Sequence, residues 1–175
     1  MTSDAETPSV PVDAPAPDVD QLDPAVLIAR RRAVTLMAVS LLLAMSAWFS
    51  TSAVGPALEA ARGYSGTDLT WMAVAVQAGF VTGTLAVAFL NVADIFKPQR
   101  VYFVGAILAA AAAISLLPDQ TATPAIVSRF AVGLSLAAVY PVAMKIVAGW
   151  YRVGRGLVLG VMIGALSLGS GLPHL

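Results

Sequence analysis

The stretch LTWMAVAVQAGFVTGTLAVAFLNVADIFKPQR, residues 69–100, decides the fold. It opens with an apolar run of about 20 residues that carries no charge until Asp94. An α-helix rises 1.5 Å per residue, so a run of this length spans the ~30 Å hydrocarbon core of a bilayer. A short polar segment follows, from Asp94 to Arg100, with an acid, two bases and a proline. The stretch therefore predicts a membrane-spanning helix that ends in a polar hinge.

Composition extends this prediction to the whole chain of 175 residues, which is 58% hydrophobic and only 11% charged, with a mean hydropathy of +0.82. Soluble proteins carry about 25% charged residues, so this chain lacks the polar surface that water requires on all sides. Four further apolar runs surround the first. We expect an all-α, polytopic helical membrane protein whose first partner is the lipid bilayer. The predicted transmembrane helices cover about residues 33–54, 69–90, 101–117, 124–148 and 156–175.

The N-terminal segment, residues 1–29, has a different composition. Six of the ten acidic residues precede Arg30, among several prolines and small side chains. Such a segment cannot bury enough apolar surface to offset the entropy lost on ordering. It is predicted to be a disordered tail, and a partner-binding tail is the alternative.

Positive charges fix the expected orientation. With five spans, most of the basic residues fall on one side of the membrane, and the opposite loops contain only Arg62. Because basic residues gather in cytoplasmic loops, the N-terminus is predicted to be cytoplasmic and the protein to lie in the cell membrane. The basic residues on the predicted cytoplasmic side are Arg30, Arg31, Arg32, Lys97, Arg100, Lys145, Arg152 and Arg155.

Several function classes lack the residues they need. The chain has no cysteine and one histidine, His174, so neither a disulfide nor a metal site is expected. No nucleophile stands near a base in a catalytic pattern, so the chain is not expected to be an enzyme or to use a cofactor. A nucleic-acid partner is not expected either.

Arg129 is the first candidate functional residue, because it lies inside the fourth predicted helix. A charge in the membrane interior costs at least ~2.5 kcal/mol unless it is paired or solvated. The alternative is that the side chain snorkels to the outer headgroups. Gly133, Leu136 and Tyr140 project on the same helical face, which adds Tyr140 to a predicted substrate or proton pathway. Pro141 is predicted to kink this helix near Tyr140.

The second predicted helix carries a polar stripe of Thr70, Gln77, Thr84 and Asn91. Polar side chains in hydrocarbon need partners, so this stripe should face other helices or a wet cavity. Helix–helix association and a pathway that includes Gln77 and Thr84 are both open interpretations. Trp48 on the first helix could line the same pathway, although aromatic residues near a helix end often form an interfacial belt.

Two glycine rows predict close helix packing. Gly79 and Gly83 stand four residues apart in the second helix, and Gly156, Gly160 and Gly164 repeat at the same spacing in the fifth. Small residues at this spacing allow two membrane helices to approach closely. The fifth helix therefore presents a surface for a partner helix.

Two motifs carry a resemblance to a known family. The hinge reads LNVADIFKPQR, in which Ala93 and Asp94 coincide with the A-D of the motif G-x-L-A-D-R-x-G-R-R. In the fourth helix, Arg129 and Gly133 match R-x-x-x-G. These motifs are typical of the major facilitator superfamily, and residues 33–175 resemble its N-terminal half, about the first five of twelve helices.

This resemblance implies roles for specific residues. Asp94, with Lys97 and Arg100, resembles the hinge that holds one access state of the transporter. Arg129 resembles an arginine implicated in proton coupling or in contact with an anionic substrate. The polar stripe and the glycines of the fifth helix resemble surfaces that pack against the C-terminal half, so that half or another membrane chain is an expected partner.

The leading hypothesis is therefore transmembrane transport of a small-molecule substrate by alternating access, as secondary active transport. The chain ends within the second three-helix repeat, so a fragment of a longer transporter is expected. The alternative is a non-transporting membrane assembly or partner-binding subunit that uses the glycines of the fifth helix.

Overall fold

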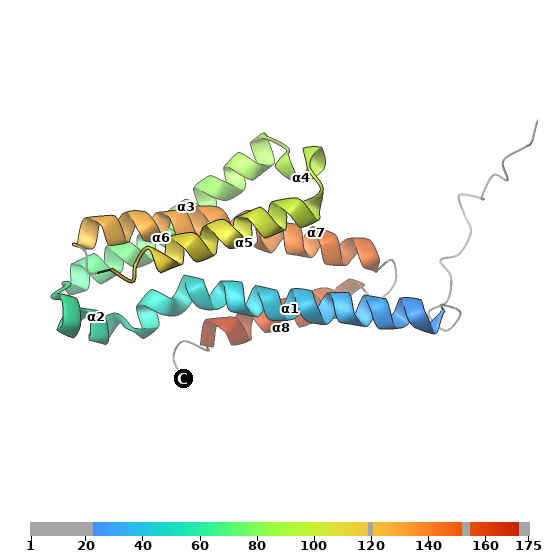
Figure 1. Ribbon diagram of the computed structural model, residues 1–175, viewed down its shortest axis with the longest axis horizontal. Helices are drawn as coiled ribbons and strands as arrows, with labels where there is room; N and C mark the ends of the chain where they lie inside the picture. Colours follow the sequence, from blue (N-terminus) through green and yellow to red (C-terminus); the bar gives the residue numbers. More distant parts are fainter. Residues whose placement is uncertain (1–22, 119–120, 152–154, 172–175) are drawn as a thin grey trace, which may run out of the picture.

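The computed structural model describes residues 23–118, 121–151 and 155–171, and it is built from helices that run roughly along one long axis (Figure 1). No strand occurs in these ranges, so the predicted all-α class is confirmed. The helices are α1 (Pro24–Ala53), α2 (Gly55–Arg62), α3 (Gly66–Phe89), α4 (Val92–Ile95), α5 (Pro98–Ile114), α6 (Ala122–Leu136), α7 (Tyr140–Trp150) and α8 (Arg155–Gly171).

Three of these elements are long and apolar enough to cross a membrane. They are Pro24–Ala53, Gly66–Phe89 and Ala122–Gly149, the last comprising α6 and α7. Two shorter apolar helices are Pro98–Ile114 and Gly156–Leu168. Each of the five corresponds to one predicted segment, which agrees with a multi-pass membrane protein.

The first helix begins earlier than the composition predicted. Residues 24–29, part of the predicted tail, form the first turns of α1. Asp23 caps this helix, because its side chain accepts a hydrogen bond from the amide N–H of Ala25 at 2.8 Å. Pro24 adds a fixed backbone angle that suits the first helical position. The rest of the predicted tail, residues 1–22, lies outside the described ranges.

The predicted linker between the first two spans also contains a helix, α2. Pro56 stands in its first turn, and Gly63 ends it in the left-handed conformation, with φ 66°. The next helix, α3, begins at Gly66 rather than at residue 69. Its first turn is held by a capping box, in which the Ser65 amide donates to Asp68 Oδ2 at 2.9 Å and the Asp68 amide donates to Ser65 Oγ at 3.2 Å.

The predicted hinge at residues 94–100 is shorter in the structure. α4 occupies Val92–Ile95, and α5 begins at Pro98 rather than at residue 101. Lys97 is consequently the residue that precedes α5, and Arg100 lies in its first turn. Proline favours this start because its missing N–H has no helical partner to lose at the first position.

The predicted fourth span is divided. α6 ends at Leu136 and α7 begins at Tyr140, because Pro141 has no N–H to continue the helical ladder. This break lies where the kink was predicted. Pro124 is the third residue of α6 and not the first, but its missing N–H is still unneeded there.

α6 makes the most extensive helix pairing of the described bundle, which is with α3. α3 and α5 both lie along α6, and α1 pairs with α8 (Figure 1). The main core joins buried side chains from α1, α6 and α8, among them Leu41, Leu136 and Met162. Large apolar side chains such as Phe103, Ile107 and Leu168 remain exposed on the outside of the bundle, as expected where the solvent is lipid.

Candidate functional site

Arg129 is buried in the second turn of α6, with only 1% of its surface exposed. Val132 and Gly133, one turn further on, lie on the same face of the helix and are also buried. This face of α6 therefore points into the bundle. The side chain therefore does not snorkel to a membrane surface. Among the described residues it is the one charged side chain in the buried class.

One nitrogen of the Arg129 guanidinium forms hydrogen bonds to α1. Nη1 donates to the carbonyl oxygen of Ala47 at 3.0 Å and to the hydroxyl of Ser50 at 3.3 Å. The atoms Nε and Nη2 are buried and have no hydrogen-bond partner among the described residues. An arginine has five N–H donors, and a buried donor without a partner is unfavourable. Arg129 is thus half satisfied: Nη1 is hydrogen-bonded to α1, whereas Nε and Nη2 have no partner among the described residues.

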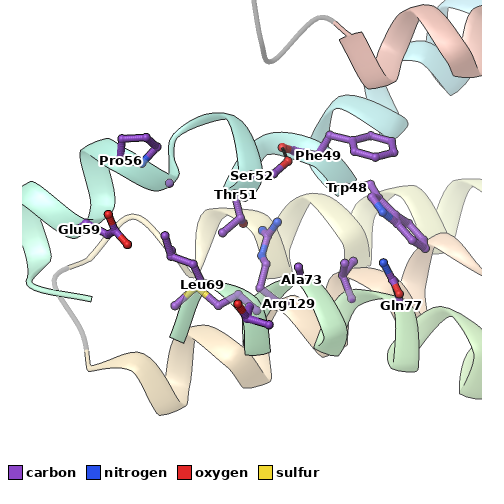
Figure 2. Close-up of a pocket in the computed structure, with 14 residues that line it drawn as sticks. Trp48, Phe49, Thr51, Ser52, Pro56, Glu59, Leu69, Ala73, Gln77 and Arg129 are labelled. Carbon is purple, nitrogen blue, oxygen red and sulfur yellow. Dashed lines mark hydrogen bonds between the residues drawn. The ribbon is translucent and has the colours of Figure 1, made fainter. Parts of the chain in front are cut away.

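A cavity of about 550 Å³ lies beside Arg129, between α1, α2, α3 and α6 (Figure 2). Trp48 and Thr51 reach into it from α1, and Gln77 reaches into it from α3 (Figure 2). Trp48 also packs edge-to-face on Phe80 of α3, with ring centroids 5.1 Å apart. The side chains that line the cavity and carry a polar group are Trp48, Thr51, Ser52, Glu59, Thr70, Gln77 and Arg129.

A second, smaller cavity of about 230 Å³ lies between α1, α2, α3, α5 and α6. Arg129, Thr51 and Met72 line both cavities, so these three side chains separate them. Arg62 and Tyr64, at and just after the end of α2, also line the second cavity. We call the end of the bundle that holds α2 the loop end. Arg129 therefore has hollow space on two sides.

Arg62 fastens α2 to the end of α5. Its Nη1 donates to the carbonyl oxygen of Leu116 at 2.8 Å, and its Nη2 donates to that of Leu117 at 2.9 Å. These carbonyls follow the last turn of α5 and have no helical donor. All three residues line the second cavity.

An acid and a base share the larger cavity. Glu59, an exposed residue of α2, lines it together with Arg129. Glu59 is not among the hydrogen-bond partners of Arg129. The cavity therefore offers a cationic donor group and, toward the loop end, an anionic acceptor group.

The structure brings three of the five predicted pathway residues together and leaves two apart. Arg129, Gln77 and Trp48 line one cavity. Tyr140 lies beyond the break between α6 and α7, eleven residues after Arg129, and packs half-buried against the main core. Thr84 lies two turns beyond Gln77, and its hydroxyl is buried without a hydrogen-bond partner among the described residues.

The predicted hinge residues lie at the other end of the bundle. Lys97 and Arg100 are exposed at the start of α5, whereas nothing is described for the side chain of Asp94. The basic residues of the predicted cytoplasmic face that fall in the described ranges are at this same end, and Arg62 is at the opposite one (Figure 1). Arg152 and the side chain of Arg155 lie outside those ranges.

Sequence reasoning did not select Thr51, Met72 or the carbonyl group of Ala47, although all three surround Arg129. Thr51 is buried and belongs to the run Ser50-Thr51-Ser52 at the end of α1. Three consecutive hydroxyl residues in an apolar helix were a signal for this site. The position of an alanine carbonyl carries no such signal.

The two glycine rows have different surroundings. A Cβ on Gly79 or Gly83 would meet backbone atoms of α6, and a Cβ on Gly133 would meet the Val76 carbonyl oxygen of α3. A Cβ on Gly156, Gly160 or Gly164 would meet nothing within 4 Å. The helix that the second row was predicted to accept is therefore not one of the described elements.

The comparisons with known proteins give one match. The family model of the Major Facilitator Superfamily matches residues 36–172, which include parts of all five apolar segments. No curated protein and no solved structure matches the chain.

Proposed function

This chain belongs to the Major Facilitator Superfamily, a superfamily of multi-pass membrane transporters, and we propose that it moves a small solute across the cell membrane by alternating access. In this proposal Arg129 contacts the solute. The mechanism consists of binding and conformational change, with no catalytic step and no cofactor.

The half-satisfied guanidinium of Arg129 carries this proposal. Its Nε and Nη2 atoms lack partners although the side chain is buried. An intramembrane charge is costly and marks a substrate or ion pathway by default. A solute with a carboxylate, phosphate or carbonyl oxygen would accept hydrogen bonds from these two atoms, and the planar guanidinium suits a two-oxygen acceptor. We therefore expect the solute to present such a group to Arg129.

The cavity has the dimensions and lining of a small-molecule site. Its volume of about 550 Å³ lies within the range of roughly 300–1,000 Å³ for ligand pockets. Trp48 and Leu69 offer apolar surface, while Gln77 and Thr70 offer hydrogen-bonding groups. A solute of metabolite size with both polar and apolar parts fits this lining.

The same geometry suggests how access could alternate. The cavity lies toward the loop end that holds Arg62, and the basic hinge with Lys97 and Arg100 lies at the other end. By the positive-inside rule the hinge end is cytoplasmic, so the cavity opens on the outer side. Opening of the hinge end would then release the solute to the cytoplasm or admit it from there.

Solute binding can be measured apart from transport. In a Trp71→Phe/Trp150→Phe background, Trp48 is the remaining tryptophan and its fluorescence reports on the cavity. We would titrate the purified chain with a panel of small carboxylates, phosphate esters, neutral sugars and organic cations, and measure uptake of the same radiolabelled compounds into proteoliposomes.

Arg129→Gln should weaken binding of the active compound by at least tenfold, since a hydrogen bond to a charged group contributes about 1.5–3 kcal/mol. Arg31→Gln, which changes an exposed arginine at the other end of the bundle, is the matched control and should bind normally. If Arg129→Gln and Arg31→Gln bind the active compound equally well, Arg129 does not contact the solute.

A further inference from the structure

A groove on the outside of the bundle is unrelated to the Arg129 cavity. It has a volume of about 500 Å³ and lies between α4, α5 and α6. Leu134 and Ser135 of α6 line it, together with Ala138 in the turn between α6 and α7. Leu134 is five residues beyond Arg129, which places it about 140° round the helix. The groove and the solute cavity therefore lie on different faces of α6.

α4 connects α3 to α5 at one end of the bundle, and the groove begins there (Figure 1). α5 lies close to the end of α6 and the turn after it, since a Cβ on Gly105 would lie 3.1 Å from the Ser135 carbonyl oxygen and 2.9 Å from the Cβ of Ala138. Val92 of α4 and Phe96, the residue after α4, line the end of the groove that holds Arg100. The result is a channel along α5, open to the outside of the bundle.

The lining is apolar along the groove and cationic at one end. Val104 and Leu108 of α5 are exposed along it. The hydroxyl of Ser135 also lines the groove, but its proton is donated to the Ala131 carbonyl oxygen at 2.8 Å. Arg100 is the one charged side chain in the lining, and it stands in the first turn of α5. The groove runs for about 12 Å between Arg100 and Leu108 by helix rise.

We propose that this groove binds one anionic phospholipid, with an acyl chain along Val104 and Leu108 and the phosphate group at Arg100. An apolar groove open to the bilayer is filled by hydrocarbon, and a cation where that groove reaches the polar surface attracts an anionic headgroup. Lys97, exposed three residues before Arg100, adds charge of the same sign at this end. The anionic lipids of the cytoplasmic leaflet face this end in the orientation predicted from the basic residues.

The test is a lipid titration of the purified chain in mild detergent, read by native mass spectrometry. The probes are dioleoylphosphatidylglycerol and dioleoylphosphatidylcholine at equal concentrations. Wild-type protein should retain one molecule of phosphatidylglycerol, the anionic lipid, in preference to phosphatidylcholine, the choline lipid. Arg100→Gln should lower retention of the anionic lipid about fivefold, the size expected for one basic residue at a membrane surface. Retention of the choline lipid should fall less, because its ammonium group offsets the charge of its phosphate.

Arg31→Gln is the matched control, because Arg31 is an exposed arginine of α1 at the same end and does not line the groove. Leu108→Trp fills the groove and should lower retention of both lipids. Because Leu108 is 53% exposed, this variant should keep the wild-type helical content, and Val104→Trp provides an independent second filling variant. Glycerol 3-phosphate should fail to displace the bound lipid, since it has no acyl chain.

Several results would overturn the assignment. Equal losses in Arg100→Gln and Arg31→Gln would show diffuse surface attraction instead of a site. Unchanged retention in both tryptophan variants would remove the acyl chain from the groove, and displacement by glycerol 3-phosphate would show a phosphate site without a lipid tail. A dimer that forms in place of the lipid complex and is lost in Leu108→Trp would identify a second copy of the chain as the occupant.

Discussion

The contact between α3 and α6 and the glycine row of α8 use the same sequence pattern and have opposite surroundings. At the first, Gly79, Gly83 and Gly133 bring two backbones together, and there is no space for even one methyl group. At the second, Gly156, Gly160 and Gly164 face no described atom within 4 Å. Four-residue spacing of glycine therefore permits close approach but does not show that a partner is present.

This difference has a consequence for function. The backbones of α3 and α6 are in close contact, and this pair carries both Gln77 and Arg129 of the cavity. Two sides of the proposed solute site are thus packed directly against each other. α1 supplies Trp48 and is joined to Arg129 through Ala47 and Ser50, so its position can respond to the solute.

Gly133→Ala should cause the largest effect. The new methyl group would overlap the Val76 carbonyl oxygen and lie 2.8 Å from the Phe80 amide nitrogen, so α3 and α6 must separate. Overpacking of this kind costs about 3 kcal/mol or more. Thermal unfolding in detergent, followed by circular dichroism, should show a midpoint lowered by roughly 6–12 °C. An unchanged midpoint would contradict the close contact at the centre of the pair.

Gly83→Ala should have a smaller effect of the same sign. Its Cβ would lie 2.6 Å from the Leu134 carbonyl oxygen and 2.7 Å from the Cβ of Ala137, nearer the end of the contact. We expect a loss of about 1–2 kcal/mol, measured in the same unfolding experiment. A loss as large as that of Gly133→Ala would mean that the contact is equally tight along its whole length.

Gly160→Ala should have the smallest effect, with the opposite sign. Its Cβ would meet nothing within 4 Å, and alanine in a helix interior is favoured over glycine by about 0.5–1 kcal/mol. The unfolding midpoint should rise slightly or stay constant. A clear decrease would reveal that another helix, from a second chain or from residues outside the described ranges, covers this row.

The sequence by itself determined the membrane environment, the helical class and the approximate position of each apolar segment. These follow from local quantities, the length of an uncharged run and the positions of prolines, which act within one helix. Helix ends were less accurate where a cap decided them, as with Asp23 at α1 and the Ser65–Asp68 capping box at α3. Arg129, Gln77 and Trp48 were also selected from sequence, because polar or amphipathic residues in apolar helices need partners.

Tertiary structure alone decided which of these residues meet. It placed Arg129 against the carbonyl group of Ala47, separated Tyr140 and Thr84 from the cavity, and gave a contact to one glycine row but not to the other. Helical periodicity fixes the direction of a side chain around its own axis. The neighbouring helix, its distance and its register depend on packing among segments far apart in the chain, and a single sequence does not specify these locally.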